Sequence, residues 1–402
     1  MRDVVIVDFA RTAFAARGGA LRLLSATQTG ARCLQALLKK SGICERGGDA
    51  VLSAVFAGCS VASKDAGTPT RYMTQLAGLP LAMEGHFVEM QDASALASVN
   101  QAAAQIALGY ADVVIAGAME SFSTRPAFMS ATTEPYQGLA PAWVVQKQSP
   151  FAEQDLPPEE ANDRLAAAWD LSREACDDYA LESRGRLESA LRGGRIGEEI
   201  AAIDVPTGSK KLEAPMEKDE LPAAFPTRGE LGAMAPLLPG GTTTKGNSSV
   251  YGDGAGFLLL MTPEKAKELG YVPYARWIIG ADAGTEPVKR GIAPAASALK
   301  ALKRADLGVK DIGVWENSEL YAAEDLAVMK ALEKQSGTAV DRKLWNAFGG
   351  ALGLGYPGAA TGAQMLMFAV KRLEQSGSRF AAVSAAADGG MAVTVLLENL
   401  RS

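Results

Sequence analysis

The 402-residue chain has few of the side chains on which metal and redox sites are usually built. It contains 1 His and 4 Cys, and no two of the cysteines form a Cys-x-x-Cys pair. The cysteines are Cys33, Cys44, Cys59 and Cys176. Their spacing argues against a disulfide framework and against a zinc site, and a single imidazole limits histidine-based acid/base chemistry. We therefore predict no resident metal and interpret the thiols as buried or incidental.

Long apolar runs and long basic runs are also missing. No uninterrupted apolar stretch reaches the roughly 18 residues that a membrane helix needs, and the segment from Met1 to Asp8 lacks a signal-peptide cleavage site. No run of Lys or Arg exceeds two residues, and the formal net charge is −6. Such an acidic balance argues against a phosphate backbone as partner. We expect a cytoplasmic protein that binds neither a membrane nor nucleic acid.

Apolar segments of strand length alternate along the chain with segments of helix length. The first round predicts strands at Val4 to Asp8, Ala54 to Gly58 and Asp112 to Ala116, with helices at about 25–40 and 95–108. A second round of the same kind covers residues 272–397. Strands that are apolar without alternation are typical of sheets covered by helices on both faces. The sequence therefore predicts an α/β protein built from two similar βαβαβ-type halves.

A long irregular segment interrupts the first half. Between about residues 120 and 245, loops containing Pro, Gly and Ser surround two polar helical segments. An insertion of this length usually covers a site or mediates assembly. We therefore divide the chain into an N-terminal half, residues 1–268, which carries a loop insertion at about 120–245, and a C-terminal half, residues 269–402.

Ordered motifs over essentially the whole chain resemble those of the thiolase family. The motifs are Ala10-Arg-Thr-Ala-Phe14, Ala111-Asp-Val-Val-Ile-Ala-Gly-Ala-Met-Glu-Ser121, Gly246-Asn-Ser-Ser249 with Asp253-Gly-Ala255, and Asn346-Ala-Phe-Gly-Gly-Ala-Leu-Gly-Leu-Gly-Tyr-Pro357. The resemblance implies a thiolase fold, with the two halves in a five-layered α-β-α-β-α arrangement. It also implies a coenzyme A thioester as substrate or ligand, and a homodimer or homotetramer.

The catalytic positions of the family carry different side chains in this sequence. Thiolases hold an acyl group on a Cys at a helix N-terminus and use a His and a second Cys as base and acid. Here Asp92 stands at the nucleophile position, Tyr356 at the His position and Ala386 at the second Cys position. Asp388 stands at the next Gly position. Neighbouring residues stay in register with the family pattern, so the site is replaced rather than misaligned.

Further positions implied by the resemblance bear on ligand binding. Ser318 stands where the family has a water-holding Asn, and Glu319 is retained beside it. Ser249 matches a loop position close to pantetheine, and Gly390 belongs to a Gly-Gly pair that allows backbone amides to face an acyl oxygen. The basic pair at 210–211 either meets the phosphates of coenzyme A or is ordinary solvated surface.

The replacements favour chemistry without a thiol. A carboxylate at a helix N-terminus is stabilised there and is a poor nucleophile toward a thioester. If Asp92 and Asp388 face one pocket, one can act as base and the other as acid, while Tyr356 donates a hydrogen bond to an oxyanion. The structural alternatives are a helix cap for Asp92, a turn residue for Asp388 and simple space filling for Tyr356.

Three hypotheses for function follow from these residues. The first is an enzyme that binds an acyl-CoA or β-keto compound and uses Asp92, Asp388 and Tyr356 for carbon–carbon hydrolysis, decarboxylation or proton transfer. The second is a non-catalytic thiolase-like subunit that binds ligand or pairs with an active partner in a hetero-oligomer. The third is an ordinary acetyl-CoA C-acyltransferase, in which one of the four cysteines reaches the site from elsewhere.

Overall fold

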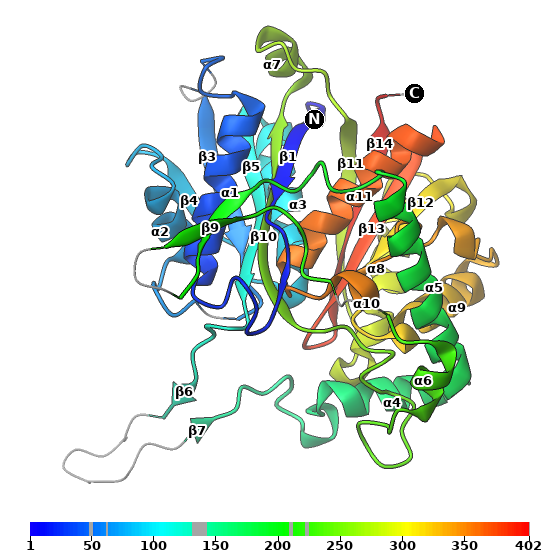
Figure 1. Ribbon diagram of the computed structural model, residues 1–402. Helices are drawn as coiled ribbons and strands as arrows, with labels where there is room; N and C mark the ends of the chain where they lie inside the picture. The colour runs from blue at the N-terminus through cyan, green and yellow to red at the C-terminus, as the bar shows by residue number, and fades with distance from the viewer. Residues whose placement is uncertain (48–50, 62, 131–142, 209–211, 222–224, 402) are drawn as a thin grey trace.

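Strands from both ends of the chain form one mixed sheet in the computed structural model, which describes residues 1–47, 51–61, 63–130, 143–208, 212–221 and 225–401. Its strands are β1 (Val4–Arg11), β2 (Ala15–Ala16), β3 (Leu52–Gly58), β4 (Glu84–Phe87), β5 (Val113–Ser121), β10 (Gly252–Met261), β11 (Ala275–Gly284), β12 (Ile312–Asn317), β13 (Phe380–Ala387) and β14 (Met391–Asn399). The spatial order is β12-β13-β14-β11-β1-β10-β5-β3-β4, with β2 paired to β10 (Figure 1).

The two halves of this sheet share one topology. In the N-terminal half β3 is parallel to β5, β5 antiparallel to β10, and β10 antiparallel to β1. In the C-terminal half β12 is parallel to β13, β13 antiparallel to β14, and β14 antiparallel to β11. The halves meet where β1 and β11 pair over three residues. The duplicated α/β unit expected from the sequence is therefore confirmed.

Helices lie on both sides of each half and also between the halves. They are α1 (Ala26–Ser41), α2 (Pro69–Leu76), α3 (Ser94–Leu108), α7 (Pro263–Glu268), α8 (Ala293–Arg304), α9 (Ala322–Ser336), α10 (Ala351–Leu354) and α11 (Ala360–Ser376). Helices α3 and α11 pack against strands of both halves and form one apolar core with them. A second core joins α1 to the N-terminal strands, and a third joins α8 and α9 to the C-terminal strands. These layers give the predicted α-β-α-β-α arrangement.

Local sequence explains several of these boundaries. Ser25 caps α1 in a capping box with Gln28, and α1 ends at Gly42, which adopts the left-handed conformation that favours glycine. Every residue of β1 and of β10 is buried, as expected for strands covered on both faces. The sequence did not predict β4, because this short edge strand is mostly exposed and carries His86 rather than an apolar run.

The helices of the insertion lie beside the C-terminal half, whereas its short β8–β9 hairpin packs against the N-terminal half. It contains β6 (Phe128–Met129), β7 (Trp143–Val144), α4 (Pro158–Ala168), α5 (Arg173–Arg192), β8 (Ile203–Pro206), β9 (Glu213–Met216) and α6 (Arg228–Ala233). Helix α5 packs on α9 and α10, and α4 packs on α9. The segment that carries β6 and β7 extends away from the body of the molecule (Figure 1). Short 3-10 turns complete the chain: η2 (Gln91–Ala93), η3 (Ala152–Gln154), η4 (Pro287–Ile292), η5 (Val309–Asp311) and η6 (Arg342–Leu344).

Close packing of β5 against β10 makes one glycine essential for stability. A Cβ added to Gly117 would lie 2.0 Å from the carbonyl oxygen of Gly256 and 2.8 Å from Cα of Phe257. We expect Gly117→Ala to destabilise the fold by about 1–3 kcal/mol, measured as a lower melting temperature. The control is Gly185→Ala inside α5, where nothing lies within 4 Å and alanine is expected to stabilise the helix by about 0.5–1 kcal/mol. Equal melting temperatures for the two variants would contradict the prediction.

Candidate active site

Asp92 lies in η2, the turn that immediately precedes α3, two residues before Ser94. The turn is fixed by Ser94, whose hydroxyl accepts a hydrogen bond from the Met90 N–H (2.9 Å) and donates one to the Gln91 carbonyl (2.6 Å). Helix α3 has no side-chain cap, so Asp92 does not act as the cap that the structural alternative required. Its side chain lines a cavity instead.

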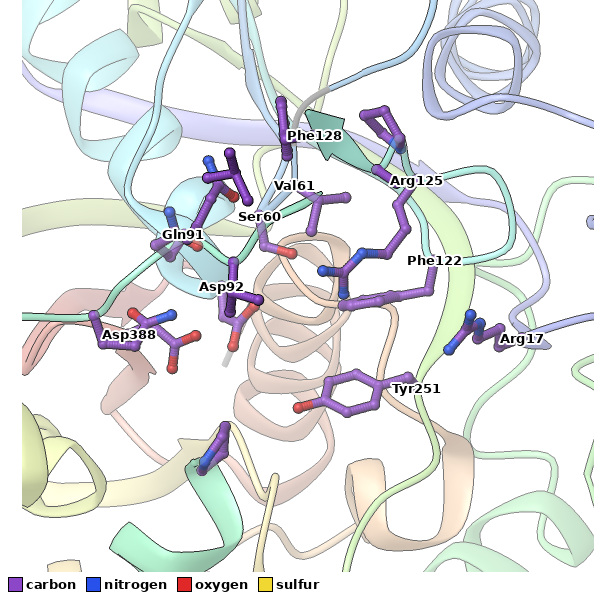
Figure 2. Close-up of a pocket in the computed structure, with 17 residues that line it drawn as sticks. Arg17, Ser60, Val61, Gln91, Asp92, Phe122, Arg125, Phe128, Tyr251 and Asp388 are labelled. Atoms are coloured by element: carbon purple, nitrogen blue, oxygen red, sulfur yellow. The ribbon is translucent and has the colours of Figure 1, made fainter. Parts of the chain in front are cut away.

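The cavity has a volume of about 550 Å³ and lies between the sheet and the insertion. Asp92 and Asp388 both line it, and Figure 2 shows their carboxyl groups on the same side. Arg17 and Arg125 bring positive charge to it, while Phe122 and Tyr251 supply aromatic surface. Residues 126–128 and 144–148 of the insertion contribute Pro126, Ala127, Phe128, Val144, Val145, Gln146 and Gln148. The volume is in the range of pockets that bind small organic ligands.

Arg290 is the cation that joins the buried carboxylates of the site. It comes from η4, is only 5% exposed, and forms an ion pair with Asp388. Its guanidinium also lies 3.9 Å from a carboxylate oxygen of Asp92 and 3.6 Å from one of Glu324. Nε and Nη2 of Arg290 have no hydrogen-bond partner among the described residues, so these two buried nitrogens interact with Asp92 and Glu324 through charge alone. Asp388 is thus both the turn residue of the β13–β14 connection and an ion-pair partner.

Burial changes the acidity of these groups. Burial, with a contribution from Asp388, raises the pKa of Asp92 to about 6, although Arg290 acts in the opposite direction. Burial also raises the pKa of Glu324 to about 7, again against the effect of Arg290. A carboxyl group with a pKa near neutrality can exchange a proton in either direction. The electrostatics therefore suit Asp92 to acid/base chemistry.

Tyr356 lies behind the cavity rather than on its wall. It is fully buried, and its backbone is held by hydrogen bonds to Val250 and Gly252. Its hydroxyl has no hydrogen-bond partner of good geometry among the described residues, yet Tyr356 is close enough to Asp92 to affect the pKa of that carboxyl. Burial, and then the charge of Asp92, raises the pKa of Tyr356 well above its usual value. The phenol therefore stays protonated and is a donor.

A further buried carboxylate, Glu120, lies behind Ser60. The Glu120 carboxylate, from β5, accepts hydrogen bonds from the Ser60 N–H (2.7 Å), from the Ser60 hydroxyl and from the Ala359 N–H (3.3 Å). Burial raises the pKa of Glu120 to about 7. Ser60 itself lines the cavity. Its hydroxyl also lowers the pKa of the nearby Asp92 carboxyl group by hydrogen bonding.

Ser318 and Glu319 do not line the cavity, and their catalytic roles stay predictions. The Ser318 hydroxyl accepts a hydrogen bond from the Ala386 N–H (3.3 Å) and so ties the end of β12 to β13. The Glu319 carboxylate is fully buried and accepts hydrogen bonds from Tyr179 (2.8 Å), Ser183 (2.7 Å) and Asn346 (2.9 Å). Glu319 therefore holds α5 of the insertion against the C-terminal half.

The predicted ligand-binding residues also lie outside the cavity lining. The Ser249 hydroxyl donates a hydrogen bond to the Glu319 carbonyl (2.5 Å). Gly390 has φ +81°, and an added Cβ would lie 2.4 Å from the Thr285 carbonyl oxygen, so glycine is required by the β13–β14 turn. Lys210 and Lys211 lie outside the described residues. A coenzyme A role for Ser249 and Gly390 stays a prediction.

None of the four cysteines lines the cavity. Cys33, Cys59 and Cys176 are buried, and burial raises the pKa of each thiol, to about 12 for Cys33 and Cys176. Cys59 precedes Ser60, but its side chain belongs to the apolar core on the α1 side of the sheet. Because a thiol reacts as its thiolate, these three are poor nucleophiles.

We expect iodoacetamide to modify Cys44 in the folded protein and to leave the three buried thiols unmodified, because Cys44 is the exposed one. Peptide mapping after denaturation in a second alkylating reagent distinguishes the two groups. Rapid alkylation of Cys59 in the native protein would contradict this prediction and would favour a mechanism in which a cysteine carries the acyl group.

Metal-binding clusters and membrane-spanning helices are both absent from the described residues. No group of three or more His, Cys, Asp and Glu side chains there has a geometry that could hold a metal ion. Within the same residues, no helix is both long and apolar enough to cross a membrane. The single histidine, His86, is stacked on Phe56 at a ring distance of 4.4 Å on the sheet edge, away from the cavity.

The chain belongs to the thiolase family. The family description "Thiolase, N-terminal domain" matches residues 4–264, and "Thiolase, C-terminal domain" matches residues 271–399. These matches together span nearly the whole chain, in agreement with the duplicated topology.

Individual relatives are similar over their full length. The chain is 30% identical to an acetyl-CoA acetyltransferase of Thiocystis violacea, covering 99% of both chains, and 31% identical to a 3-ketoacyl-CoA thiolase of Bacillus subtilis, covering 99% of this chain and 100% of the relative. Among solved structures, the acetyl-CoA acetyltransferase of Bacillus anthracis superposes with a TM-score of 0.90 at 29% identity, over 100% of this chain and 99% of the other. Human mitochondrial 3-ketoacyl-CoA thiolase in complex with CoA gives 0.88 at 28% identity, over 99% and 98%.

Proposed function

We propose that this thiolase-family protein binds an acyl-CoA or β-ketoacyl-CoA in the cavity and transforms it by carboxylate rather than thiol chemistry. The observation that carries the proposal is Asp92: a buried carboxyl group on the cavity wall with a pKa of about 6, beside the buried cation Arg290 and close to a second cavity-lining carboxylate, Asp388. These properties favour proton transfer, decarboxylation or carbon–carbon hydrolysis.

Each polar group has a distinct role in this proposal. Asp92 takes the proton, because its carboxylate form predominates above its pKa. Arg290 lies behind the cavity wall, where it pairs with Asp388 and stabilises the negative charge of the Asp92 carboxylate. Tyr356 supplies a further protonated donor behind Asp92.

The ligand class rests on two supports. A related structure, human mitochondrial 3-ketoacyl-CoA thiolase, is a complex with CoA. In this chain the cavity offers aromatic surface at Phe122 and Tyr251 and positive charge at Arg17 and Arg125, which suits an acyl thioester whose carrier is anionic. Assembly into a homodimer or homotetramer stays a prediction from the resemblance.

The test combines binding and turnover. Calorimetry with coenzyme A, acetyl-CoA and acetoacetyl-CoA is expected to detect binding, and mass spectrometry is expected to detect a product from at least one β-ketoacyl-CoA. A variant in which all four cysteines are replaced by alanine is expected to keep the activity. Binding without any turnover favours the non-catalytic subunit instead, and loss of turnover in the cysteine-free variant, if it remains folded, favours an ordinary acyltransferase. Absence of binding to all three compounds overturns the proposal.

A further inference from the structure

Ser60 is the one Ser, Thr or Cys among the described residues that line the cavity. It follows β3, and its hydroxyl donates a hydrogen bond to the Glu120 carboxylate. The same hydroxyl is close enough to Asp92 to lower the pKa of that carboxyl group. A hydroxyl between two carboxyl groups at the wall of a ligand-sized cavity has the arrangement of an activated nucleophile: the nucleophile, an adjacent base and a third polar group.

The Glu120 carboxylate is held in position by the backbone around it. It accepts hydrogen bonds from the N–H groups of Ser60 (2.7 Å) and Ala359 (3.3 Å), so its orientation does not depend on the Ser60 hydroxyl alone. The backbone of Gly358 packs directly against Ser60 and Glu120. A Cβ added to Gly358 would lie 2.5 Å from Oγ of Ser60 and 2.6 Å from Oε2 of Glu120. The backbone therefore fits tightly around these two side chains.

We propose that Ser60 accepts the acyl group of a thioester, with Glu120 as the base. This rests on the proposed function, because it requires an acyl-CoA in the same cavity, and it names the residue on which the acyl group is carried. Oγ of Ser60 attacks the thioester carbonyl, the C–O bond forms and the C–S bond breaks. The Ser60 proton moves to the Glu120 carboxylate and from there to the leaving thiolate, which departs as the free thiol of coenzyme A. Water then hydrolyses the ester on Ser60.

The surroundings of Ser60 favour this step. Arg125 and Arg17 are cations on the cavity wall, and Figure 2 shows the guanidinium of Arg125 extending inward on the side of Ser60. A cation near the carbonyl oxygen stabilises the negative charge of the tetrahedral intermediate. Glu120 is fully buried with a pKa of about 7, so it can both accept and return the proton near neutral pH.

The experiment is mass spectrometry of the intact protein after brief incubation with acetyl-CoA or acetoacetyl-CoA and an acid quench. The expected result is one acyl group per chain, acetyl from acetyl-CoA and acetoacetyl from acetoacetyl-CoA, mapped to the peptide that contains Ser60. Ser60→Ala is expected to lose the label, and Ser63→Ala, a serine three residues further along that does not line the cavity, is expected to keep it. Ser60→Cys is expected to carry the group as a thioester that neutral hydroxylamine removes. Glu120→Gln is expected to slow acylation by about 10²–10⁴-fold.

Each other outcome is decisive. A label on Asp92 or Cys59, or a label that persists in Ser60→Ala, overturns the assignment of Ser60. Turnover that depends on Asp92 without any acylated serine, and that Ser60→Ala leaves unchanged, overturns this inference while the proposed function stands. Absence of acyl-CoA binding overturns both. Melting temperatures of the variants separate loss of the nucleophile from loss of the fold, and Ser60→Cys preserves the test if Ser60→Ala does not fold.

Discussion

Replacing Asp92 with asparagine is expected to lower the rate of turnover of the β-ketoacyl-CoA substrate by about 10²–10⁴-fold, with binding of coenzyme A nearly unchanged. The amide fills the same space but cannot take up a proton. The wild-type rate is expected to rise with pH between about 5 and 7, because burial raises the pKa of Asp92 to about 6 and the base is its deprotonated form. In Asp92→Asn this rise should vanish from the residual rate.

Glu89→Gln is the matched control for this experiment. Glu89 is an exposed carboxylate of the same segment and does not line the cavity, so its amide variant should retain the wild-type rate and pH dependence. Full activity in Asp92→Asn would show that Asp92 has only a structural role. A loss of coenzyme A binding equal to the loss of rate would show that Asp92 contributes to binding rather than to the chemical step.

Arg290→Met is expected to have the largest effect on stability, about 3–5 kcal/mol at pH 8. The substitution removes the positive charge from a site that is 5% exposed and leaves the carboxylates of Asp388, Asp92 and Glu324 without their common partner. The loss should appear as a lower melting temperature and a lower midpoint of chemical unfolding. An exposed control, Arg164→Met, breaks only a surface ion pair with Glu160 and should cost about 1 kcal/mol or less.

The cost of Arg290→Met is expected to be smaller at pH 5 than at pH 8. Burial raises the pKa of Asp92 to about 6 and that of Glu324 to about 7 even with Arg290 present, and removal of the cation raises both further. A folded state whose carboxyl pKa is raised binds more protons than the unfolded state, so its stability falls as pH rises through that pKa. The double variant Arg290→Met with Asp388→Asn should recover part of the loss at pH 8. A cost independent of pH would contradict this electrostatic account.

The pairing of Asp92 with Asp388 in one pocket could be expected from the sequence, because motifs of the family fix both positions relative to the strands. Helix α3 begins two residues after Asp92, and the β13–β14 turn carries Asp388 to the same cavity. Their partner Arg290 was not foreseen. It lies in a short 3-10 turn far away in sequence, and a basic residue after Lys289 resembles ordinary surface charge until the fold is known.

The sequence around Glu120 already indicates a buried carboxylate that needs a partner. It is a carboxylate within β5, a strand whose nine residues are all buried, and a charged residue in such a strand requires a partner inside the protein. Its partner Ser60 gave no signal, since serine after a strand is common in loops. For Glu319 the family pattern suggested catalysis and gave no indication of its hydrogen-bond partners, which are Tyr179, Ser183 and Asn346, all outside the cavity.

The strand order has a consequence for how the chain folds as it is synthesised. β10 lies between β1 and β5, although it follows both in sequence, and β14, near the C-terminus, lies between β11 and β13. During translation β1 is therefore synthesised well before β10, the strand that pairs with it in the N-terminal half. In the same way β11 is synthesised well before β14, its pairing partner in the C-terminal half. Until then the backbone N–H and C=O groups on one edge of β1 and of β11 are unpaired and can pair with another chain. The C-terminal half of the sheet therefore stays open between β11 and β13 until β14 has been synthesised.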